Sequence, residues 1–173
     1  TEAWSQVRMG SQGAVVSNHP LSSLAGMRML MNGGNAVDAA VAIGFALGVA
    51  EPQGSGIASD GFIMVHMKEP GTVAIANGTG YAPMAATAER FKNGLETTGI
   101  LSVSVPGLCD ALLSAHERHG RLSLKECIAP AIELCLEGVP QTHYQYKLAQ
   151  SCDQLHKFPA SADIFAPGGH PLR

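Results

Sequence analysis

The sequence is poor in charged and aromatic residues. Asp, Glu, Lys and Arg make up 14% of its 173 residues, aromatic side chains make up 5%, and the formal net charge is −3. Soluble domains usually carry about 25% charged residues. Because no run of Lys or Arg is present, we expect neither nucleic acid nor a membrane surface as a partner. The low charge predicts that another chain covers part of the surface; an Ala- and Gly-rich enzyme domain is the alternative.

Motifs for metal, phosphate and serine-hydrolase chemistry are also missing. The four cysteines show no C-x-x-C spacing, and neither His116 nor His119 has an acid at ligand spacing. We therefore expect no metal, reduced thiols in the core, and exposed or capping histidines. The glycine-rich loop 54–61 lacks the spacing of a phosphate-binding loop, so no cofactor is expected, and its amide groups suit close approach to a substrate. Ser55 and Ser59 lie outside any G-x-S-x-G motif, which disfavours a serine hydrolase.

No apolar run is long enough to cross a bilayer. The longest, residues 36–50, is followed by Glu51-Pro52, which ends a helix. No secretory signal is recognisable, so the cytoplasm is the expected compartment, with the periplasm or secretion as the alternative.

Residues 36–50 predict the central element of the fold. Asn35 is a favourable N-cap, and Asp38 occupies the third helical position, where an acid interacts well with the helix dipole. Apolar residues occur on all sides of this helix, so we expect it to be almost wholly buried. Gly44 and Gly48 allow neighbouring elements to approach its axis closely.

The remaining pattern predicts one mixed α+β domain over residues 1–173. A buried strand is expected at Gly13–Ser17, and a helix from Pro20 that Asn32-Gly33-Gly34 ends. Two strands, Phe62–Met67 and Val73–Ala76, flank a Glu69-Pro70-Gly71 turn and predict a hairpin. The later elements are expected to be mostly helical: a short helix at Thr87–Phe91, an extended piece at Ser102–Val105, a helix from Pro106-Gly107 to Gly120, a helix from Ser123 to Gly138 with Glu126 completing a capping box, and a helix from Thr142 to Leu155.

Thr1 raises the question of an N-terminal nucleophile that uses its own amine as base. Such a threonine normally begins a buried strand. Residues 1–6 show no strand pattern, so a catalytic Thr1 is disfavoured.

Several motifs, in the same order along the chain, resemble the large subunit of gamma-glutamyltranspeptidases. They are SNHPLSSLAGMRMLMNGGNAVDAAVAIGFALGVAEPQGSGIASDGF, YAPMAAT, SVSVPGLCDALLSAHERHGRLSL and APAIELCLEGVP, and they cover nearly all the chain from about Gly10. The resemblance implies an N-terminal-nucleophile (Ntn) hydrolase with a four-layered αββα fold, to which this chain contributes a helix-rich part. It also implies a self-cleaving precursor and a heterodimer (or a larger assembly) with a small subunit that carries the nucleophilic threonine. No catalytic residue is then expected in this chain, which corresponds to the N-terminal part of a large subunit.

Two departures from the family pattern concern the substrate. Ala58-Ser59-Asp60-Gly61 stands where the family commonly has a run of glycines. In the family motif D-x-R-E-x-A-P, the Arg grips the α-carboxylate of the glutamyl group; aligned on Ala82-Pro83, Thr79 takes the place of that Arg. A hydroxyl cannot replace a bidentate guanidinium.

We therefore expect Thr79, Asn77 and Gly78 to bind the acyl part of a small amide that is not γ-glutamyl, such as oxamate or a cephalosporin side chain. A true γ-glutamyl transferase or hydrolase acting on glutathione is the alternative. A catalytically inactive homologue that serves as a scaffold or binding module is the third interpretation.

Overall fold

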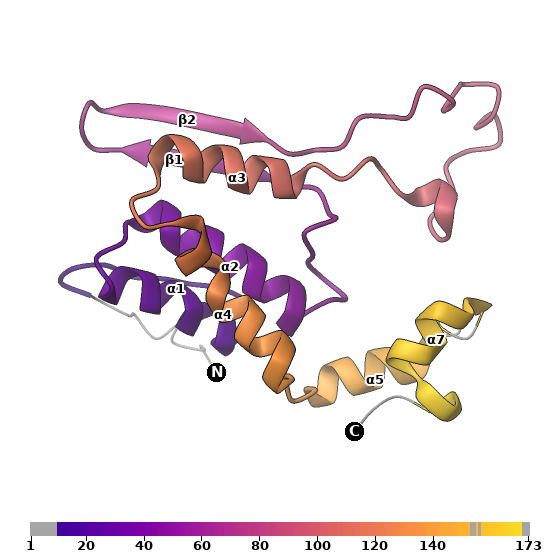
Figure 1. Cartoon of the computed structure of the whole chain (residues 1–173). Helices are drawn as coiled ribbons and strands as arrows, with labels where there is room; N and C mark the ends of the chain where they lie inside the picture. Colours follow the sequence, from indigo (N-terminus) through magenta and orange to yellow (C-terminus); the bar gives the residue numbers. More distant parts are fainter. Residues whose placement is uncertain (1–9, 153–154, 156, 171–173) are drawn as a thin grey trace, which may run out of the picture. The chain divides into compact units, whose positions relative to one another are not determined.

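The computed structural model describes residues 10–152, 155 and 157–170. The chain divides into two compact units, Thr1–Glu133 and Leu134–Arg173. The described part of the first unit contains α1 (Pro20–Met31), α2 (Ala36–Ala50), β1 (Phe62–Met67), β2 (Thr72–Asn77), α3 (Leu108–His119) and most of α4 (Leu124–Glu137) (Figure 1). The described part of the second contains the end of α4, then α5 (His143–Ser151) and α7 (Pro159–Phe165). Thr1, the disfavoured nucleophile, lies outside the described residues.

Helices α1 (Pro20–Met31) and α2 (Ala36–Ala50) form a packed pair, as the sequence predicts. The His19 ring caps α1, because its Nδ1 accepts the Leu21 N–H at 3.2 Å. The chain leaves α1 through Gly33, whose φ of +85° lies in the left-handed region that favours glycine.

A capping box begins α2. The Asn35 Oδ1 atom accepts the N–H groups of Val37 at 2.8 Å and Asp38 at 3.1 Å, and Asp38 Oδ2 accepts the Asn35 N–H at 2.7 Å. Each side chain thus pairs an N–H group that has no partner within the helix. The predicted N-cap and the acid at the third position are both confirmed.

Small residues allow α1 and α2 to pack closely. A Cβ atom at Gly26 of α1 would lie 2.6 Å from Ile43 Cδ1 of α2, so any side chain at Gly26 requires movement. The buried residues of α2 are Val37, Asp38, Ala39, Val41, Ala42, Ala46 and Ala50. Ala36 and Ala40 are exposed, and the apolar residues Ile43, Phe45, Leu47 and Val49 are only half-buried. The prediction of nearly complete burial is therefore wrong, because α1 and α3 cover only part of the helix surface.

Strands β1 (Phe62–Met67) and β2 (Thr72–Asn77) form the predicted antiparallel hairpin, with Met64 opposite Ile75. Gly71, with φ +80°, closes the turn by donating its N–H to the Met67 carbonyl at 3.0 Å. The hairpin is the one sheet found among the described residues.

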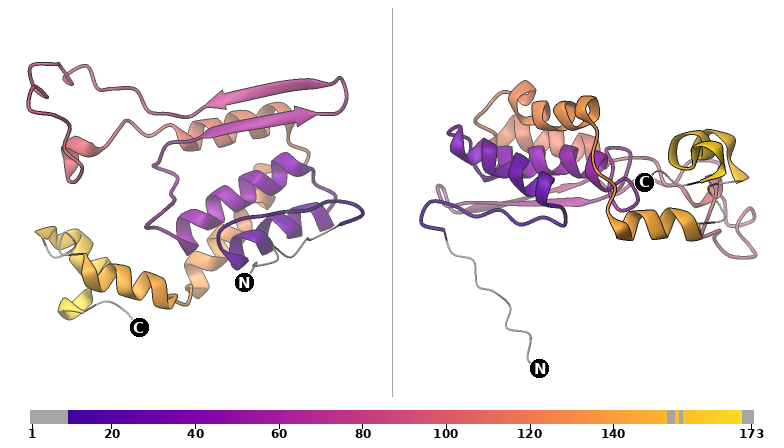
Figure 2. Two further views of the ribbon diagram at one scale, coloured as in Figure 1. Left: turned by 180° about the vertical axis from the view of Figure 1, so that it is seen from behind. Right: turned by 90° about the horizontal axis from the view of Figure 1, so that it is seen from below.

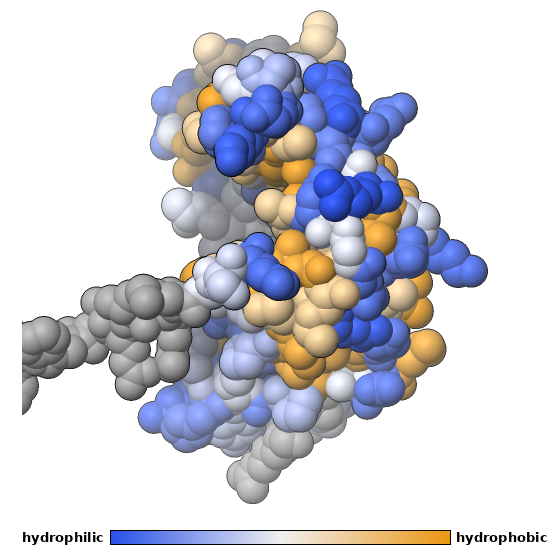
Figure 3. All heavy atoms as spheres, turned by 90° about the vertical axis from the view of Figure 1, so that its left-hand side faces the viewer, coloured by the Kyte–Doolittle hydropathy of each residue, from blue (hydrophilic) through white to orange (hydrophobic). Residues whose placement is uncertain are grey.

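The two faces of the hairpin have different surroundings. Helix α3 (Leu108–His119) packs against one face, and the right-hand view of Figure 2 shows the helices of this unit on one side of the strands. The other face carries apolar side chains that remain more than half exposed: Phe62, Met64, Val73 and Ile75. On the side of the molecule drawn in Figure 3, apolar residues in orange lie at the surface among hydrophilic residues in blue.

The later helices begin at the predicted caps. Ser123 and Glu126 form a capping box before α4 (Leu124–Glu137), with the Ser123 N–H donating to Glu126 Oε2 at 2.9 Å. In the second unit, Thr142 and Gln145 do the same for α5 (His143–Ser151), and α7 (Pro159–Phe165) follows. Helix α5 ends at Ser151, before the predicted Leu155.

Two predicted elements differ from the structure, and a third differs at its first residue. Residues 13–17 form no strand, and Val16 is 90% exposed, because no described segment pairs with this stretch. Thr87–Phe91 forms turns in place of a helix, with one helix-like bond from the Phe91 N–H to the Thr87 carbonyl at 3.3 Å. The 3₁₀ turn Ile100–Ser102 includes the first residue of the stretch expected to be extended, Ser102–Val105, whereas Val103 has the predicted extended backbone, with φ −88° and ψ 127°.

All four cysteines are free thiols: Cys127 is buried, Cys109 and Cys152 are half-buried, and Cys135 is exposed. The expected thiol state is confirmed, although the expected core position holds fully only for Cys127. Within the described residues, no helix combines the length and hydropathy that a membrane span requires.

Candidate functional site

Two glycine-containing stretches meet where the hairpin ends. The Gly78 N–H donates to the Gly61 carbonyl at 2.8 Å, and the Gly61 N–H donates back to Gly78 at 3.3 Å. This reciprocal pair continues the antiparallel ladder one step beyond Phe62 and Asn77. The loops after β2 and before β1 therefore leave the sheet side by side.

A third stretch, before α3, packs against these two loops. The Ser59 carbonyl accepts the N–H groups of Gly107 at 3.3 Å and Leu108 at 2.9 Å, and the Val105 N–H donates to the Tyr81 carbonyl at 3.4 Å. We call residues 59–61, 77–81 and 104–107 together the loop junction. Its three parts come from distant places in the sequence and are joined mainly through backbone groups.

Close backbone contact explains the glycines of the loop junction. A Cβ atom at Gly80 would lie 1.9 Å from the Val105 carbonyl oxygen, and one at Gly107 would lie 2.6 Å from the Gly78 carbonyl oxygen. Gly78 itself is buried, with space for no side chain beside Ala111. Of the three residues predicted to bind substrate, Gly78 thus has a clear packing role.

The other two predicted residues are exposed and contact each other. Asn77 Oδ1 accepts both the Thr79 backbone N–H at 2.9 Å and the Thr79 hydroxyl at 2.6 Å. This short-range turn orients the Thr79 hydroxyl toward a neutral amide oxygen. The structure therefore brings Asn77, Gly78 and Thr79 together in one loop; that they bind substrate stays a prediction.

Asp60 is a member of the loop junction that the prediction of binding residues left out. Its Oδ1 atom accepts the Gly80 N–H at 3.0 Å, and its Oδ2 atom accepts the Ser104 hydroxyl at 2.5 Å. One exposed carboxylate thus links all three stretches. The sequence feature that could have identified Asp60 is that an acid stands where the family commonly has glycine.

The loop junction offers binding groups, and its described residues include one hydroxyl bound to a carboxylate, Ser104 with Asp60, which no histidine accompanies. Ser59, one of the serines considered in the sequence, donates its hydroxyl to the Gly56 carbonyl at 2.5 Å, and a carbonyl is not a base that activates it. The available chemistry is hydrogen bonding by hydroxyl, amide and carboxylate groups around one exposed loop.

A second cluster of chemically capable side chains lies inside the first unit. One ligand atom from each of Asp38, His116 and Cys127 lies within 4.8 Å of the others, which is a spacing that a metal ion could bridge. Asp38 and Cys127 are fully buried. The His116 Nε2 atom is 3.6 Å from Asp38 Oδ1 and closer, at 3.0 Å, to the Leu122 carbonyl oxygen.

Hydrogen bonds already occupy the carboxylate oxygens through which Asp38 would bind a cation. Both Asp38 oxygens accept the Arg121 N–H, at 2.9 and 3.1 Å, and Oδ1 also accepts the Leu122 N–H at 3.2 Å. Burial, and then the charge of Asp38, raises the pKa of the Cys127 thiol to about 11, which opposes the thiolate that a metal binds. The cluster therefore acts as an anchor that fastens the turn after α3 to the start of α2.

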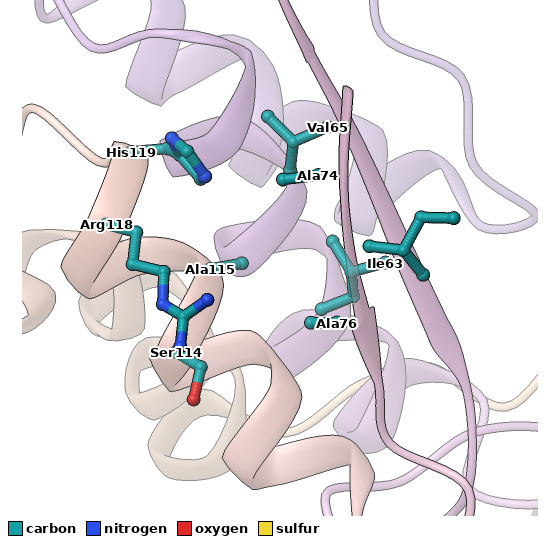
Figure 4. A pocket seen from close by; sticks show the side chains of 9 residues that line it. Ile63, Val65, Ala74, Ala76, Ser114, Ala115, Arg118 and His119 are labelled. Carbon is teal, nitrogen blue, oxygen red and sulfur yellow. The ribbon is translucent and has the colours of Figure 1, made fainter. Parts of the chain in front are cut away.

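A shallow hollow lies between the hairpin and α3. Ile63, Val65, Ala74 and Ala76 line it from the strands, and Ser114, Ala115, Arg118 and His119 line it from the helix (Figure 4). Most of its wall is aliphatic, and it includes no residue of the loop junction. Its polar side chains, Ser114, Arg118 and His119, all come from α3.

Comparison with known proteins gives consistent matches along the chain. Residues 22–173 match the family described as Gamma-glutamyltranspeptidase. The chain is 37% identical over 188 residues to the Glutathione hydrolase proenzyme of Bacillus subtilis strain 168, covering 99% of this chain and 31% of that protein. It is 38% identical over 178 residues to the Acylase ACY 1 proenzyme of Pseudomonas sp. strain SE83, covering 95% and 32%.

The fold matches a solved structure of the same kind. The crystal structure of Helicobacter pylori gamma-Glutamyltranspeptidase superposes with a TM-score of 0.90 at 30% identity, covering 97% of this chain and 50% of that one. The chain thus spans about a third of the length of the two curated relatives and half of the H. pylori chain.

Proposed function

Because the chain belongs to the gamma-glutamyltranspeptidase family, whose members are hydrolases and transferases with an Ntn-hydrolase fold, we propose that it forms part of an amide-cleaving enzyme. In this proposal residues 1–173 are the N-terminal part of a large subunit. The nucleophilic threonine begins a separate small subunit, and the two subunits assemble as a heterodimer. Both relatives are named proenzymes, which supports such processing.

The proposed reaction passes through an acyl-enzyme. The small-subunit threonine hydroxyl adds to the amide carbonyl carbon, and the amine of that threonine takes the hydroxyl proton. The C–N bond then breaks, the proton leaves with the amine product, and an ester to the threonine remains. Water, or another amine, releases the acyl group from the ester. This chain supplies part of the wall around the acyl group, at residues 77–81.

The pair formed by Thr79 and Asn77 carries the substrate assignment. Thr79 stands where the family motif has an Arg, and its hydroxyl already donates to Asn77 Oδ1 at 2.6 Å. A neutral hydroxyl contributes about 0.5–1.5 kcal/mol per hydrogen bond, whereas a desolvated bidentate guanidinium–carboxylate pair contributes several times more. We therefore propose an acyl group without the α-amino-carboxylate of glutamate, with oxamate and cephalosporin side chains as candidates.

The glutathione hydrolase among the relatives favours a second candidate, γ-glutamyl hydrolysis or transfer with a carboxylate clamp supplied by another segment. One assay on the complete, processed protein distinguishes the two candidate functions. We expect γ-glutamyl 4-nitroanilide to be turned over with a kcat/KM at least about a hundredfold below that of an acyl anilide without the amino-acid head group.

Equal turnover of the two anilides would reject the proposed specificity and support the second candidate. Turnover of neither, in protein that has been cleaved into two subunits, would favour an inactive homologue that acts as a scaffold or binding module. Thr79→Arg provides a gain-of-function test, because a correctly placed guanidinium would raise γ-glutamyl turnover selectively.

A further inference from the structure

Asp60 places a negative charge in the loop junction. Its carboxylate accepts hydrogen bonds from the Gly80 N–H at 3.0 Å and from the Ser104 hydroxyl at 2.5 Å. Because the Gly80 nitrogen is bonded directly to the Thr79 carbonyl carbon, the charge lies within a few ångströms of the Thr79 backbone. Both hydrogen-bond donors are neutral, so they orient the carboxylate without cancelling its charge.

No basic side chain neutralises Asp60 in the described part of the chain. The salt bridges found there join Arg28 to Glu133 and Lys92 to Glu89, and His116 lies beside Asp38. At the nearby N-terminus of α3, the Gly107 and Leu108 N–H groups donate to the Ser59 carbonyl. Asp110 in the first turn of that helix adds a second acid, which interacts with the positive end of the helix dipole.

We propose that Asp60 is a specificity-determining residue that makes the acyl site select against acyl groups bearing a carboxylate and in favour of neutral or amine-bearing ones. The proposal rests on the proposed function, because it assumes that residues 77–81 face the acyl group. Near Thr79 the described residues offer a substrate carboxylate no cation and place the negative charge of Asp60 beside it, which repels a carboxylate and attracts an ammonium group. Within the proposed class, a cephalosporin whose side-chain acyl group is neutral therefore fits better than oxamate, whose acyl group carries a carboxylate.

A matched substrate series tests this selection by charge. Pentanoyl, glutaryl and 5-aminopentanoyl 4-nitroanilides have acyl chains of the same length that end in a methyl, a carboxylate and an ammonium group. For the complete protein we expect kcat/KM to follow the order ammonium or methyl above carboxylate. Asp60→Asn keeps an oxygen for the Gly80 N–H and an amide for Ser104, yet removes the charge. It should raise the ratio of glutaryl to pentanoyl kcat/KM about tenfold, and the rise should shrink at high salt, which screens exposed charges.

Ser104→Ala is the matched control, because it removes one hydrogen bond to the carboxylate and leaves the charge. The glutaryl-to-pentanoyl ratio should stay at the wild-type value in this variant, whatever happens to the individual rates. An unchanged ratio in Asp60→Asn, including an equal loss on both substrates, would overturn the proposal and leave Asp60 with a purely structural role.

Failure of the proposed function can be distinguished from failure of the inference about Asp60. Fast turnover of γ-glutamyl 4-nitroanilide by the wild type rejects that function but leaves the charge ratio measurable. If no anilide is cleaved, titration calorimetry with pentanamide, glutaramate and 5-aminopentanamide still measures the charge preference. Glutaramate that binds the wild type as tightly as pentanamide, or an affinity ratio insensitive to Asp60→Asn, would contradict the inference.

Discussion

Asp38→Asn should destabilise the protein far more than its small chemical change suggests. The Asp38 side chain has 0% exposure, and its two oxygens accept backbone N–H groups from Asn35 at 2.7 Å, Arg121 at 2.9 and 3.1 Å, and Leu122 at 3.2 Å. An asparagine amide has one oxygen. Whichever way it is oriented, the N–H of Asn35 or that of Leu122 faces an NH₂ group and loses its acceptor.

The expected cost follows from these contacts. A hydrogen bond to a charged group contributes about 1.5–3 kcal/mol, and an orphaned buried donor costs about 1–3 kcal/mol. Asp38→Asn loses one hydrogen bond and weakens the others, and the removal of a buried charge offsets part of that loss. The net destabilisation should be about 3 kcal/mol. The bonds also join α2 to the turn after α3, so the effect reaches beyond the α2 cap.

Thermal melting and urea denaturation of the complete protein measure this cost. Asp110→Asn is the matched control, since Asp110 is an exposed acid in the first turn of α3 and should change the unfolding free energy by less than about 1 kcal/mol. An Asp38→Asn variant no less stable than the Asp110→Asn control would refute the assignment of Asp38 as a structural anchor.

Two further predictions concern the core of the same unit. Gly44→Leu should destabilise by about 1–3 kcal/mol, because a Cβ atom at Gly44 already lies 3.1 Å from both Leu112 methyl carbons, and a melting temperature within a degree of the wild type would contradict this packing. For Cys127, burial and then the charge of Asp38 raise the pKa of the thiol from 9.0 to about 11 in the folded state. The thiol therefore stays protonated to a higher pH in the folded state than in the unfolded state. Stability should therefore fall as the pH rises from about 9 to 11, and more steeply in the wild type than in Cys127→Ala; parallel curves for the two proteins would exclude the thiol as the cause.

Several features of the fold could be predicted from short stretches of sequence. Asn35 with Asp38, and Ser123 with Glu126, stand three residues apart, which is the spacing at which one helical turn brings a cap and an acid together. The hairpin followed from two apolar runs around a Pro-Gly turn. The contact of Thr79 with Asn77 is equally local, since it joins residues two apart.

Other features depended on segments that are distant in the sequence. Residues 13–17 have the composition of a strand, but a strand also requires a neighbour, and none of the described segments provides one. All-round burial of α2 was predicted from its apolar composition, yet half-buried Phe45 shows that composition does not say how much surface the rest of the chain covers.

The candidate site also contains residues that the sequence predicted and one whose contacts only the fold revealed. Asn77, Gly78 and Thr79 were found from a motif, whereas the role of Asp60 became visible only when the fold placed Gly80, 20 residues away, and Ser104, 44 residues away, beside its carboxylate. Hydrogen bonds between near neighbours follow from residue type and spacing, so the sequence alone determined the caps, the turn and the Asn77–Thr79 contact. Bonds between distant residues form only after the backbone has folded back on itself, and the tertiary structure therefore decided the loop junction and the Asp38 anchor.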